Sequence, residues 1–259
     1  MSSMFAQVMD RLRALTWTEA CGVFLAENLL IFLLVVSGGE YLVRCYRSRP
    51  VSAPPEPITA KELTVACGNV LLNTAITLAG WLLWKRGIIQ FRTDAGWGAA
   101  VDVLVLILVM DLLMYWLHRL AHTPVLFRHM HQMHHRYERV RPLTLFALNP
   151  LENLGFGLLW LVVISIYPAS WLGMSIYLML NVVCGVIGHL GVEPVPAKWA
   201  QQPGISSIAG SSFHAQHHQY PQHNFGFYTL IWDRLFGTLR AGYAQDYGRL
   251  PSQQPAESP

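Results

Sequence analysis

The sequence predicts an all-α protein, an integral-membrane bundle of about four to five spanning or hairpin helices. Hydrophobic residues make up 53% of the chain and charged residues only 13%, whereas soluble domains are about 25% charged. Several apolar stretches reach the roughly 20 residues that a helix needs to cross a bilayer. The formal net charge of +3 is small, and no Lys/Arg-rich run occurs, so the charge pattern does not support nucleic-acid binding.

Three apolar stretches are long enough to span the membrane as helices. They cover residues 21–43, 63–84 and 99–117. The first has no small-residue cleavage site after it and runs into Glu40 and Arg44. We therefore interpret it as a retained anchor rather than a signal peptide.

Prolines mark the breaks between the other elements. Four prolines lie within residues 50–57, and because proline is excluded from helix interiors, this stretch predicts a stiff loop outside the membrane. A longer apolar region covers residues 143–190, and Pro168 divides it into the two arms of a helical hairpin. The residues after 241 are rich in Gln, Pro and Ser and predict a disordered tail.

Basic residues gather on one side of this predicted bundle. Most of the 18 Lys and Arg residues fall in the loops after the first span, after the third span and after the hairpin. Cytoplasmic loops are enriched in these residues, so we place this side in the cytoplasm. In the absence of a cleavable leader or a retention signal, we favour a bacterial inner membrane over the endoplasmic reticulum.

Eight of the 11 histidines fall in three short motifs, one HxxxH followed by two copies of HxxHH. On a helix, residues i, i+3 and i+4 share a face, so each motif should aim its imidazoles in one direction. All three motifs lie on the side assigned to the cytoplasm. Their histidines are His118 and His122, then His131, His134 and His135, and finally His214, His217 and His218.

This number of imidazoles at this spacing predicts metal binding. Protonated imidazoles packed together would repel one another, whereas a metal ion keeps them neutral. One ion takes about four to six ligands, so eight or nine histidines indicate a two-metal site. Imidazole suits Zn, Cu, Fe and Ni, and the ligands alone do not choose among them.

Other metal-binding classes fit less well. A zinc protease of the HExxH type needs a glutamate beside the first histidine, and no HExxH occurs. A membrane haem protein would leave the adjacent histidine pairs unexplained, and the Glu-x-x-His motif of carboxylate-rich di-iron bundles is absent. The alternative from a different class is a histidine-rich metal-binding membrane transporter or sensor, which would place histidines along a path through the spans.

The three motifs, in this order and after hydrophobic hairpins, resemble those of the fatty acid hydroxylase/sterol desaturase superfamily of integral-membrane di-iron oxygenases. The similarity covers about residues 102–238, and the residues before it show only compatible hydrophobicity. Besides the histidines it is carried by Asp111-Leu-Leu-Met-Tyr115-Trp116-Leu-His118-Arg119, Arg141-Pro142, Pro150-Leu-Glu152, Gly188-His189-Leu-Gly191-Val-Glu193, Asn224-Phe225-Gly226 and Ile231-Trp232-Asp233-Arg234-Leu-Phe236-Gly237-Thr238.

The resemblance implies that the eight motif histidines bind two iron ions, with His189 as an additional ligand between the second and third motifs. His129 points away from the face of the second motif and His223 lies beyond the third, so we expect neither to be a ligand. Members of the superfamily often have a histidine before the Pro-Leu-Glu segment, where this chain has Asn149.

A carboxylate in an apolar span is costly, roughly 2.5–3.5 kcal/mol on insertion scales, and usually marks function. Asp111 precedes His118 by seven residues and His122 by eleven, so the three share a helical face. We expect Asp111 to accept a hydrogen bond from a ligand imidazole, as carboxylates behind metal-bound histidines do. Glu152 and Asp233 fit the same role, although Asp233 is better placed to hold the turn around it.

The resemblance implies an oxidoreductase of lipid biosynthesis. It would use O2 as co-substrate to hydroxylate or desaturate an unactivated C–H bond of a lipid, such as a sterol or a fatty acyl chain. Each turnover needs two electrons, and the sequence shows no haem-binding module, Cys-rich cluster or nucleotide-binding motif. We expect an external donor of the cytochrome b5 or ferredoxin type to dock near Arg128, Arg136 and Arg139.

These inferences divide the chain into four parts. An N-terminal segment of residues 1–20 precedes transmembrane helices with the proline-rich loop, residues 21–98. A catalytic domain similar to the superfamily covers residues 99–241, with a cytosolic histidine-rich two-metal site. The disordered tail covers residues 242–259.

Overall fold

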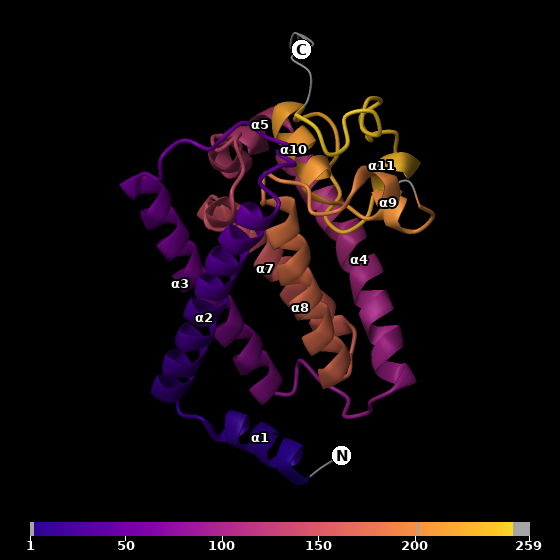
Figure 1. Ribbon diagram of the computed structural model, residues 1–259. Coiled ribbons are helices and arrows are strands. Elements are labelled where there is room, and N and C mark those ends of the chain that lie inside the picture. Colours follow the sequence, from indigo (N-terminus) through magenta and orange to yellow (C-terminus); the bar gives the residue numbers. More distant parts are fainter. Residues whose placement is uncertain (1–2, 201, 251–259) are drawn as a thin grey trace.

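The computed structural model describes residues 3–200 and 202–250 and confirms the predicted all-α class, with no β-strand in these residues. Five long helices run in alternating directions, and a cap of short helices and turns covers one end of the bundle (Figure 1). The long helices are α2 (Trp17–Cys45), α3 (Ala60–Lys85), α4 (Trp97–Ala121), α7 (Pro150–Ile166) and α8 (Trp171–Gly188). Helix α1 (Ser3–Ala14) lies at the opposite end from the cap.

Four of the five helices, α2, α3, α4 and α8, are long and apolar enough to cross a membrane. The fifth, α7, has 17 residues, about 26 Å at 1.5 Å per residue. Each observed span contains or closely matches a predicted stretch. The chain is therefore a multi-pass membrane protein whose histidine motifs all lie at the capped end.

Polar side chains begin the long helices where the sequence offers cap residues. Thr16 and Glu19 form a reciprocal capping box at the start of α2, and Thr59 accepts from the Glu62 amide at the start of α3. Asn149 caps α7 by accepting from the Leu151 amide. These caps satisfy amides that have no partner inside the helix.

The long apolar region breaks at Pro168 as predicted, but its first arm starts later than residue 143. Residues Pro142–Phe146 form a short 3-10 helix, η2, and α7 begins only at Pro150. The Asn69 side chain of α3 donates to the carbonyls of Phe146 and Leu148 at 2.9 and 2.7 Å. These contacts satisfy irregular backbone that the sequence pattern alone presents as helix.

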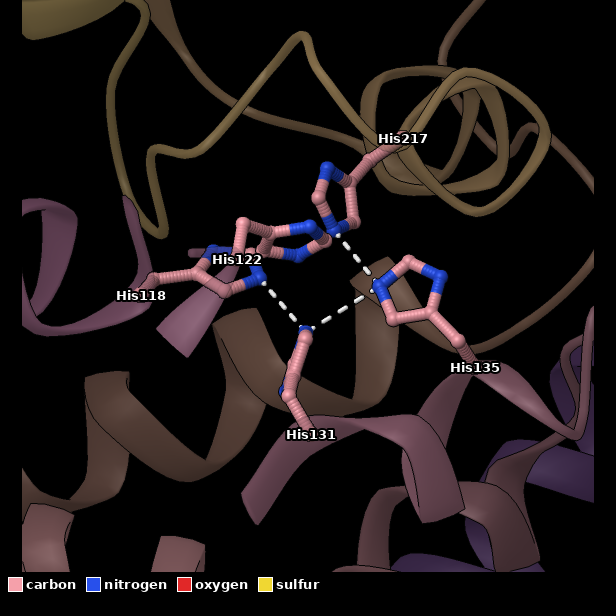
Figure 2. Close-up of side chains that lie close together, drawn as sticks. All are labelled: His118, His122, His131, His135 and His217. Atoms are coloured by element: carbon pink, nitrogen blue, oxygen red, sulfur yellow. Dashed lines mark hydrogen bonds between the residues drawn. The ribbon is translucent and has the colours of Figure 1, made fainter. Parts of the chain in front are cut away.

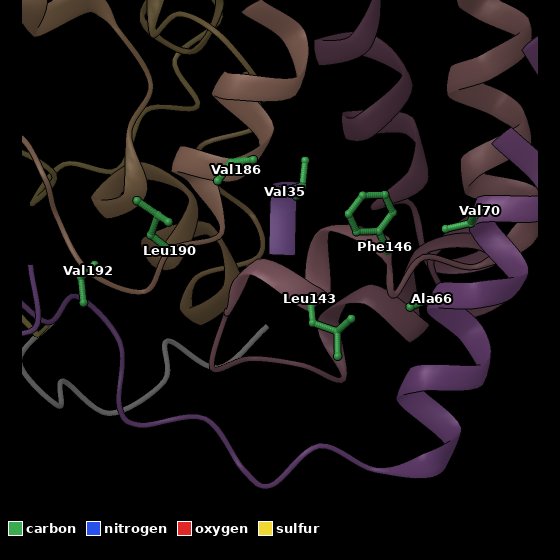
Figure 3. Close-up of a cluster of buried hydrophobic side chains, with 8 residues drawn as sticks. All are labelled: Val35, Ala66, Val70, Leu143, Phe146, Val186, Leu190 and Val192. Carbon is green, nitrogen blue, oxygen red and sulfur yellow. The ribbon is translucent and has the colours of Figure 1, made fainter. Parts of the chain in front are cut away.

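The core beneath the cap joins elements that are far apart in the sequence. Figure 3 shows buried side chains from α2, α3, η2, the end of α8 and the segment that follows it. Gly39 of α2 permits this approach, because a Cβ there would lie 2.6 Å from the Pro142 ring. On the outer face of α2, Leu30, Leu33 and Leu34 are 57–61% exposed, as expected for side chains that contact lipid.

A buried ion pair attaches the predicted proline-rich loop to the cap. Glu62 is fully buried, and Arg141 donates to it from Nε at 2.9 Å and also from Nη2. The third guanidinium nitrogen, Nη1, donates to the Glu56 carbonyl at 2.5 Å. The start of α3, the loop and the segment after the second histidine motif therefore meet at one guanidinium.

Replacing Arg141 with methionine is expected to lower the free energy of unfolding by about 3–5 kcal/mol, because the Glu62 carboxylate stays buried without its partner. The matched change Arg139→Met removes an exposed ion pair with Glu56 and should cost about 0–1 kcal/mol. Thermal unfolding of both variants in the same detergent, monitored by circular dichroism, measures the two losses of stability. Equal losses would show that the buried pair contributes no more than a surface pair.

The structure describes residues 242–250, the first part of the predicted tail. Tyr243 is 8% exposed and packs edge-on against Phe213, and Arg240 pairs with Asp246. These contacts attach residues 243–246 to the cap. Residues 251–259 lie outside the described part of the chain.

Candidate metal centre

Nine histidines meet under the cap in two adjacent clusters, and in each cluster the potential ligand nitrogens lie within 4.8 Å of one another. Five imidazoles point toward a common centre in the first cluster (Figure 2). The five-histidine cluster consists of His118, His122, His131, His135 and His217. The four-histidine cluster consists of His134, His189, His214 and His218.

Each motif is carried by the end of a helix or by a short helix of the cap. The HxxxH motif lies at the end of α4, and the second motif lies on the π-helical turn η1 (Phe127–His131) and α6 (Gln132–His135). The third motif lies on α10 (Ser211–Gln219), which packs on the end of α8. His189 directly follows α8. Four separate segments therefore supply the candidate ligands.

The two HxxHH motifs each contribute to both clusters, which differs from the prediction that each aims three imidazoles one way. In the second motif, His131 and His135 enter the five-histidine cluster and His134 enters the other. The third motif reverses this division, with only its middle histidine, His217, in the five-histidine cluster. At 3.6 residues per turn, positions i+3 and i+4 diverge by about 100°, so a short helix between two sites serves both.

Backbone carbonyls determine which ring nitrogen of two imidazoles carries the proton. His118 Nδ1 lies 2.9 Å from the Phe225 oxygen, and His217 Nδ1 lies 2.7 Å from the His223 oxygen. A carbonyl only accepts, so both Nδ1 atoms donate and both Nε2 atoms carry lone pairs. These lone pairs enter the space where His122 Nε2 is buried without a partner (Figure 2). Converging lone pairs repel unless a cation lies between them, so the donor set fits a metal ion.

The four-histidine cluster follows the same design. His189 Nδ1 donates to the Gly185 carbonyl at 2.8 Å, which leaves the Nε2 lone pair directed at His214 Nε2, 3.1 Å away. His218 Nε2 lies 3.1 Å from both His214 Nε2 and His134 Nε2. The rings of His135 and His218, one from each cluster, stack with centroids 4.6 Å apart. Two metal ions held here would be close neighbours.

Burial keeps the cap imidazoles in the neutral form that binds metals. Loss of hydration, together with the nearby imidazoles of His131 and His118, lowers the pKa of His135 to about 2. Burial also lowers the pKa of His189 to about 4, against the opposing effect of its hydrogen bond to Gly185. The pKa values of His122 and His131 shift in the same direction. None of these ligands needs to lose a proton at pH 7 before binding a metal.

Residues 103–238 match the model of the family described as fatty acid hydroxylase, which is slightly more than half of the chain. The chain belongs to the fatty acid hydroxylase family. This confirms the resemblance that the histidine motifs indicated. The match begins in α4 and ends at Thr238, so it contains all nine clustered histidines.

Curated relatives of this family member are sterol-modifying enzymes by name. It is 30% identical to a Delta(7)-sterol 5(6)-desaturase of Leptosphaeria maculans over 172 residues, which covers 64% of this chain and 46% of the relative. It is 27% identical to human lathosterol oxidase over 172 residues, 64% of this chain and 56% of the relative. The chain thus spans about half the length of these relatives. No solved structure matches it significantly.

The carboxylate that contacts a candidate ligand of this family member is Glu152 and not Asp111. Glu152 is 4% exposed and its Oε1 lies 2.7 Å from His131 Nδ1. Asp111 instead accepts from the Phe227 and Tyr228 amides and the Thr229 hydroxyl, at 3.2, 2.8 and 2.5 Å. The segment after the third motif folds back over α4 and takes up this carboxylate, a tertiary contact that helical periodicity does not reveal.

The Asn224-Phe225-Gly226 segment positions ligands through its backbone, a role that sequence reasoning missed. Asp233 accepts from the Phe225 and Gly226 amides at 2.8 Å each, and thereby holds the carbonyl that orients His118. Gly226 has no room for a side chain, because a Cβ would lie 2.5 Å from the Thr229 oxygen. Asn224 adopts a positive φ of 62°, which Asn tolerates better than most residues. The sequence signal was the small, turn-forming composition of the segment.

The remaining candidates lie outside both clusters. His129 is exposed, and His223 is half-buried and contributes its carbonyl oxygen rather than its ring. Asn149, which stands where relatives of the superfamily often have histidine, begins α7 as its cap residue.

Proposed function

We propose that this protein is a membrane-bound oxygenase that binds two iron ions at the two histidine clusters. With O2 and two electrons from an external donor, it would hydroxylate or desaturate an unactivated C–H bond of a lipid in lipid biosynthesis. The observation that carries this proposal is the pair of adjacent, buried clusters of neutral imidazoles in a family member embedded in a membrane. The names of the relatives make sterols the first substrate class to test.

The overall reaction balances in either form. Hydroxylation converts C–H, O2, two electrons and two protons into C–OH and one water. Desaturation converts two neighbouring C–H groups with the same co-reactants into C=C and two waters. Bound iron would supply the dioxygen chemistry that side chains lack.

The protein's own contribution is to hold, orient and desolvate the site. Carbonyl and carboxylate acceptors fix the imidazole orientations from behind, as described above. The rings of Phe225 and Phe227 pack on His118, with centroids 5.7 and 5.2 Å away, and Phe127 packs on His122 at 5.4 Å. These apolar rings exclude water from one side of the five-histidine cluster.

The arrangement also argues against the transporter or sensor alternative. A transport path would place ligands at successive depths along the spans, with broken helices near the midplane. Here the described histidine clusters lie together at one end of the bundle. The same end carries Arg119, Arg128, Arg136, Arg139 and Arg141, and by the positive-inside rule we propose that it faces the cytoplasm. The proposal of a bacterial inner membrane rests on the sequence signals alone.

The test is oxidation of a Δ7-sterol by the purified protein in lipid nanodiscs with ferrous iron and a reductant. We expect oxygen uptake and a product that has gained one oxygen or lost two hydrogens, identified by mass spectrometry. Replacing His217 with alanine should reduce turnover more than a thousandfold, since metal ligands act as a unit. Oxygen uptake without any lipid product across sterols and fatty acyl lipids would contradict the proposal.

The electron donor is proposed to dock over a polar cleft of about 430 Å3 at the cap surface. His135 and His218, one ligand from each cluster, line this cleft beside the exposed guanidinium of Arg136. Arg128 is also exposed, whereas Arg139 already pairs with Glu56. A donor with an acidic surface would therefore approach both metal sites over Arg136.

Replacing Arg136 with glutamate is expected to slow turnover supported by a cytochrome b5 or ferredoxin about tenfold at low salt, because it removes the attraction that steers the donor. Turnover supported by a small chemical reductant should change less than twofold. Arg47→Glu, a charge reversal at an exposed residue at the end of α2, is the matched control. Equal slowing with both kinds of reductant would remove the docking proposal.

A further inference from the structure

A second cleft opens on a different side of the five-histidine cluster. It has a volume of about 550 Å3, within the range of small-molecule sites. Trp116, Leu120, His122 and Phe225 contribute to its wall. His122 is the ligand whose Nε2 is buried without a hydrogen-bond partner. The cleft therefore reaches the outer side of the His122 ring, whose Nε2 is buried behind it, and apolar atoms make up more of its wall than polar atoms.

The rim of this cleft is apolar and exposed. Trp116 and Leu120, in the last turns of α4, are 45% and 53% exposed. Leu235 of α11 (Ile231–Leu235), which does not line the cleft itself, is 67% exposed. Phe236 packs on Trp116 with centroids 4.9 Å apart, which joins α11 to the end of α4. In Figure 1, α11 lies beside the capped end of α4.

The rim continues into the lipid-facing surface of the same helix. Leu104 and Leu108, on the spanning part of α4, are 62% and 47% exposed. A continuous apolar surface of this kind is unfavourable in water but favourable at the level of the lipid headgroups, where tryptophan is enriched. The cleft mouth thus lies where the bilayer surface meets the cap.

A positively charged side chain, that of Arg119, lies at the mouth of this cleft. The Arg119 guanidinium lies over the Trp116 ring, 5.4 Å from its centroid, and donates to the Tyr115 hydroxyl at 3.2 Å. Arg119 also lines the cleft and is only partly buried. Its remaining donors suit the oxygen of a lipid's polar end, while the apolar wall suits the hydrocarbon part.

The two clefts differ in a way that separates their roles. The cleft beside His135 and His218 is lined mostly by polar residues, among them Gln132 and Glu138, together with Phe127 and Pro221. The cleft beside His122 carries the exposed aromatic and leucine rim. An apolar molecule leaving the bilayer reaches the second cleft without crossing water.

We propose that the cleft between the end of α4 and the side chains of Gln222, Phe225 and Thr238 is the lateral entrance through which a bilayer lipid reaches the five-histidine cluster, with its polar end at Arg119. This inference rests on the proposed function for the identity of the lipid as substrate. The entrance itself is a binding site that exists whether or not the lipid is oxidised.

Two exposed glutamines provide a matched pair of variants for the test. Gln222 lines the proposed entrance, and Gln219, three residues earlier, lines the polar cleft. Neither side chain forms a hydrogen bond within the described residues, so tryptophan at either position adds the same bulk without removing a hydrogen bond. Bound metal per chain, measured for both variants, verifies that the histidine clusters remain intact.

The probe is a cholesterol analogue that bears a photoreactive diazirine, incorporated into nanodiscs with the full-length protein. Peptide mass spectrometry should locate the label within residues 116–124 and 235–238. We expect Gln222→Trp to reduce this labelling at least fivefold and Gln219→Trp to change it less than twofold. Labelling of the polar cleft in place of the entrance would overturn the proposal. So would equal effects of the two variants on labelling. Absence of label at the entrance because another protein chain covers it would overturn it as well.

The same experiment separates the entrance from the proposed function. If labelling follows the expected pattern but no lipid is oxidised, the oxygenase assignment fails and the entrance stands. If lipids are oxidised and Gln222→Trp leaves their KM within twofold of the original, the entrance is wrong and the assignment stands. If the KM for the lipid rises at least tenfold in Gln222→Trp but not in Gln219→Trp, the result supports both the entrance and the oxygenase assignment.

Discussion

Single alanine replacements at His131 and His134 are expected to remove different metal ions, each leaving about one iron per chain. The two residues are only three apart in one motif, yet the fold places His131 in the five-histidine cluster and His134 in the four-histidine cluster. The double variant should retain neither iron. Turnover in each single variant should fall more than a thousandfold, because the reaction needs both sites together.

Metal analysis after anaerobic reconstitution with ferrous iron measures this directly, for protein purified in detergent. His129→Ala is the matched control, since His129 belongs to the same short segment but is exposed and outside both clusters. It should keep two irons. Loss of both irons from either single variant would show that the two clusters do not bind their ions separately, contrary to this prediction. A single tightly held zinc that iron does not replace would contradict the di-iron proposal.

Replacing Glu152 with glutamine is expected to weaken metal binding at the five-histidine cluster about 10–100-fold, which is the usual cost of losing a carboxylate behind a ligand histidine. The 2.7 Å contact between Glu152 Oε1 and His131 Nδ1 is the physical reason. The glutamine side chain keeps the shape of glutamate but lacks its negative charge. That charge makes the His131 imidazole a stronger electron-pair donor to a metal ion. Competition with a calibrated chelator measures the affinity of the site.

The comparison variant is Asp111→Leu, at the other buried carboxylate of the region. It leaves the Phe227 and Tyr228 amides without their acceptor, at a cost of about 1–3 kcal/mol for each buried group. We expect a lower unfolding temperature with the metal affinity within a fewfold of the original. The reverse result, in which Asp111→Leu weakens metal binding more than Glu152→Gln, would restore the role that helical periodicity assigned to Asp111.

Much of the bundle follows from local chemistry. The bilayer requires continuous apolar stretches for spanning helices, and proline and cap residues define where the helices begin and end. That is why the spans, the proline-rich loop and the break at Pro168 agree with the structure. Prediction was less successful where a polar sequence is ordered by distant contacts, as at Tyr243 against Phe213, or where an apolar sequence is irregular, as before Pro150.

The sequence by itself determined the residue types of the site and their spacing. Histidines repeated at i, i+3 and i+4 predict metal binding wherever the helices lie, because side-chain direction on a helix depends only on residue spacing. The family match agrees with that inference.

Only the tertiary structure decided how the histidines are shared. The division of His134 from His135, and of His217 from His218, depends on which neighbour each short helix packs against. The Phe225 carbonyl behind His118 and the amides that take up Asp111 belong to a segment more than 100 residues along the chain that folds back over α4. Glu152 reaches His131 from the start of a different helix, 21 residues away. Such contacts join residues distant in the chain, so no local periodicity encodes them.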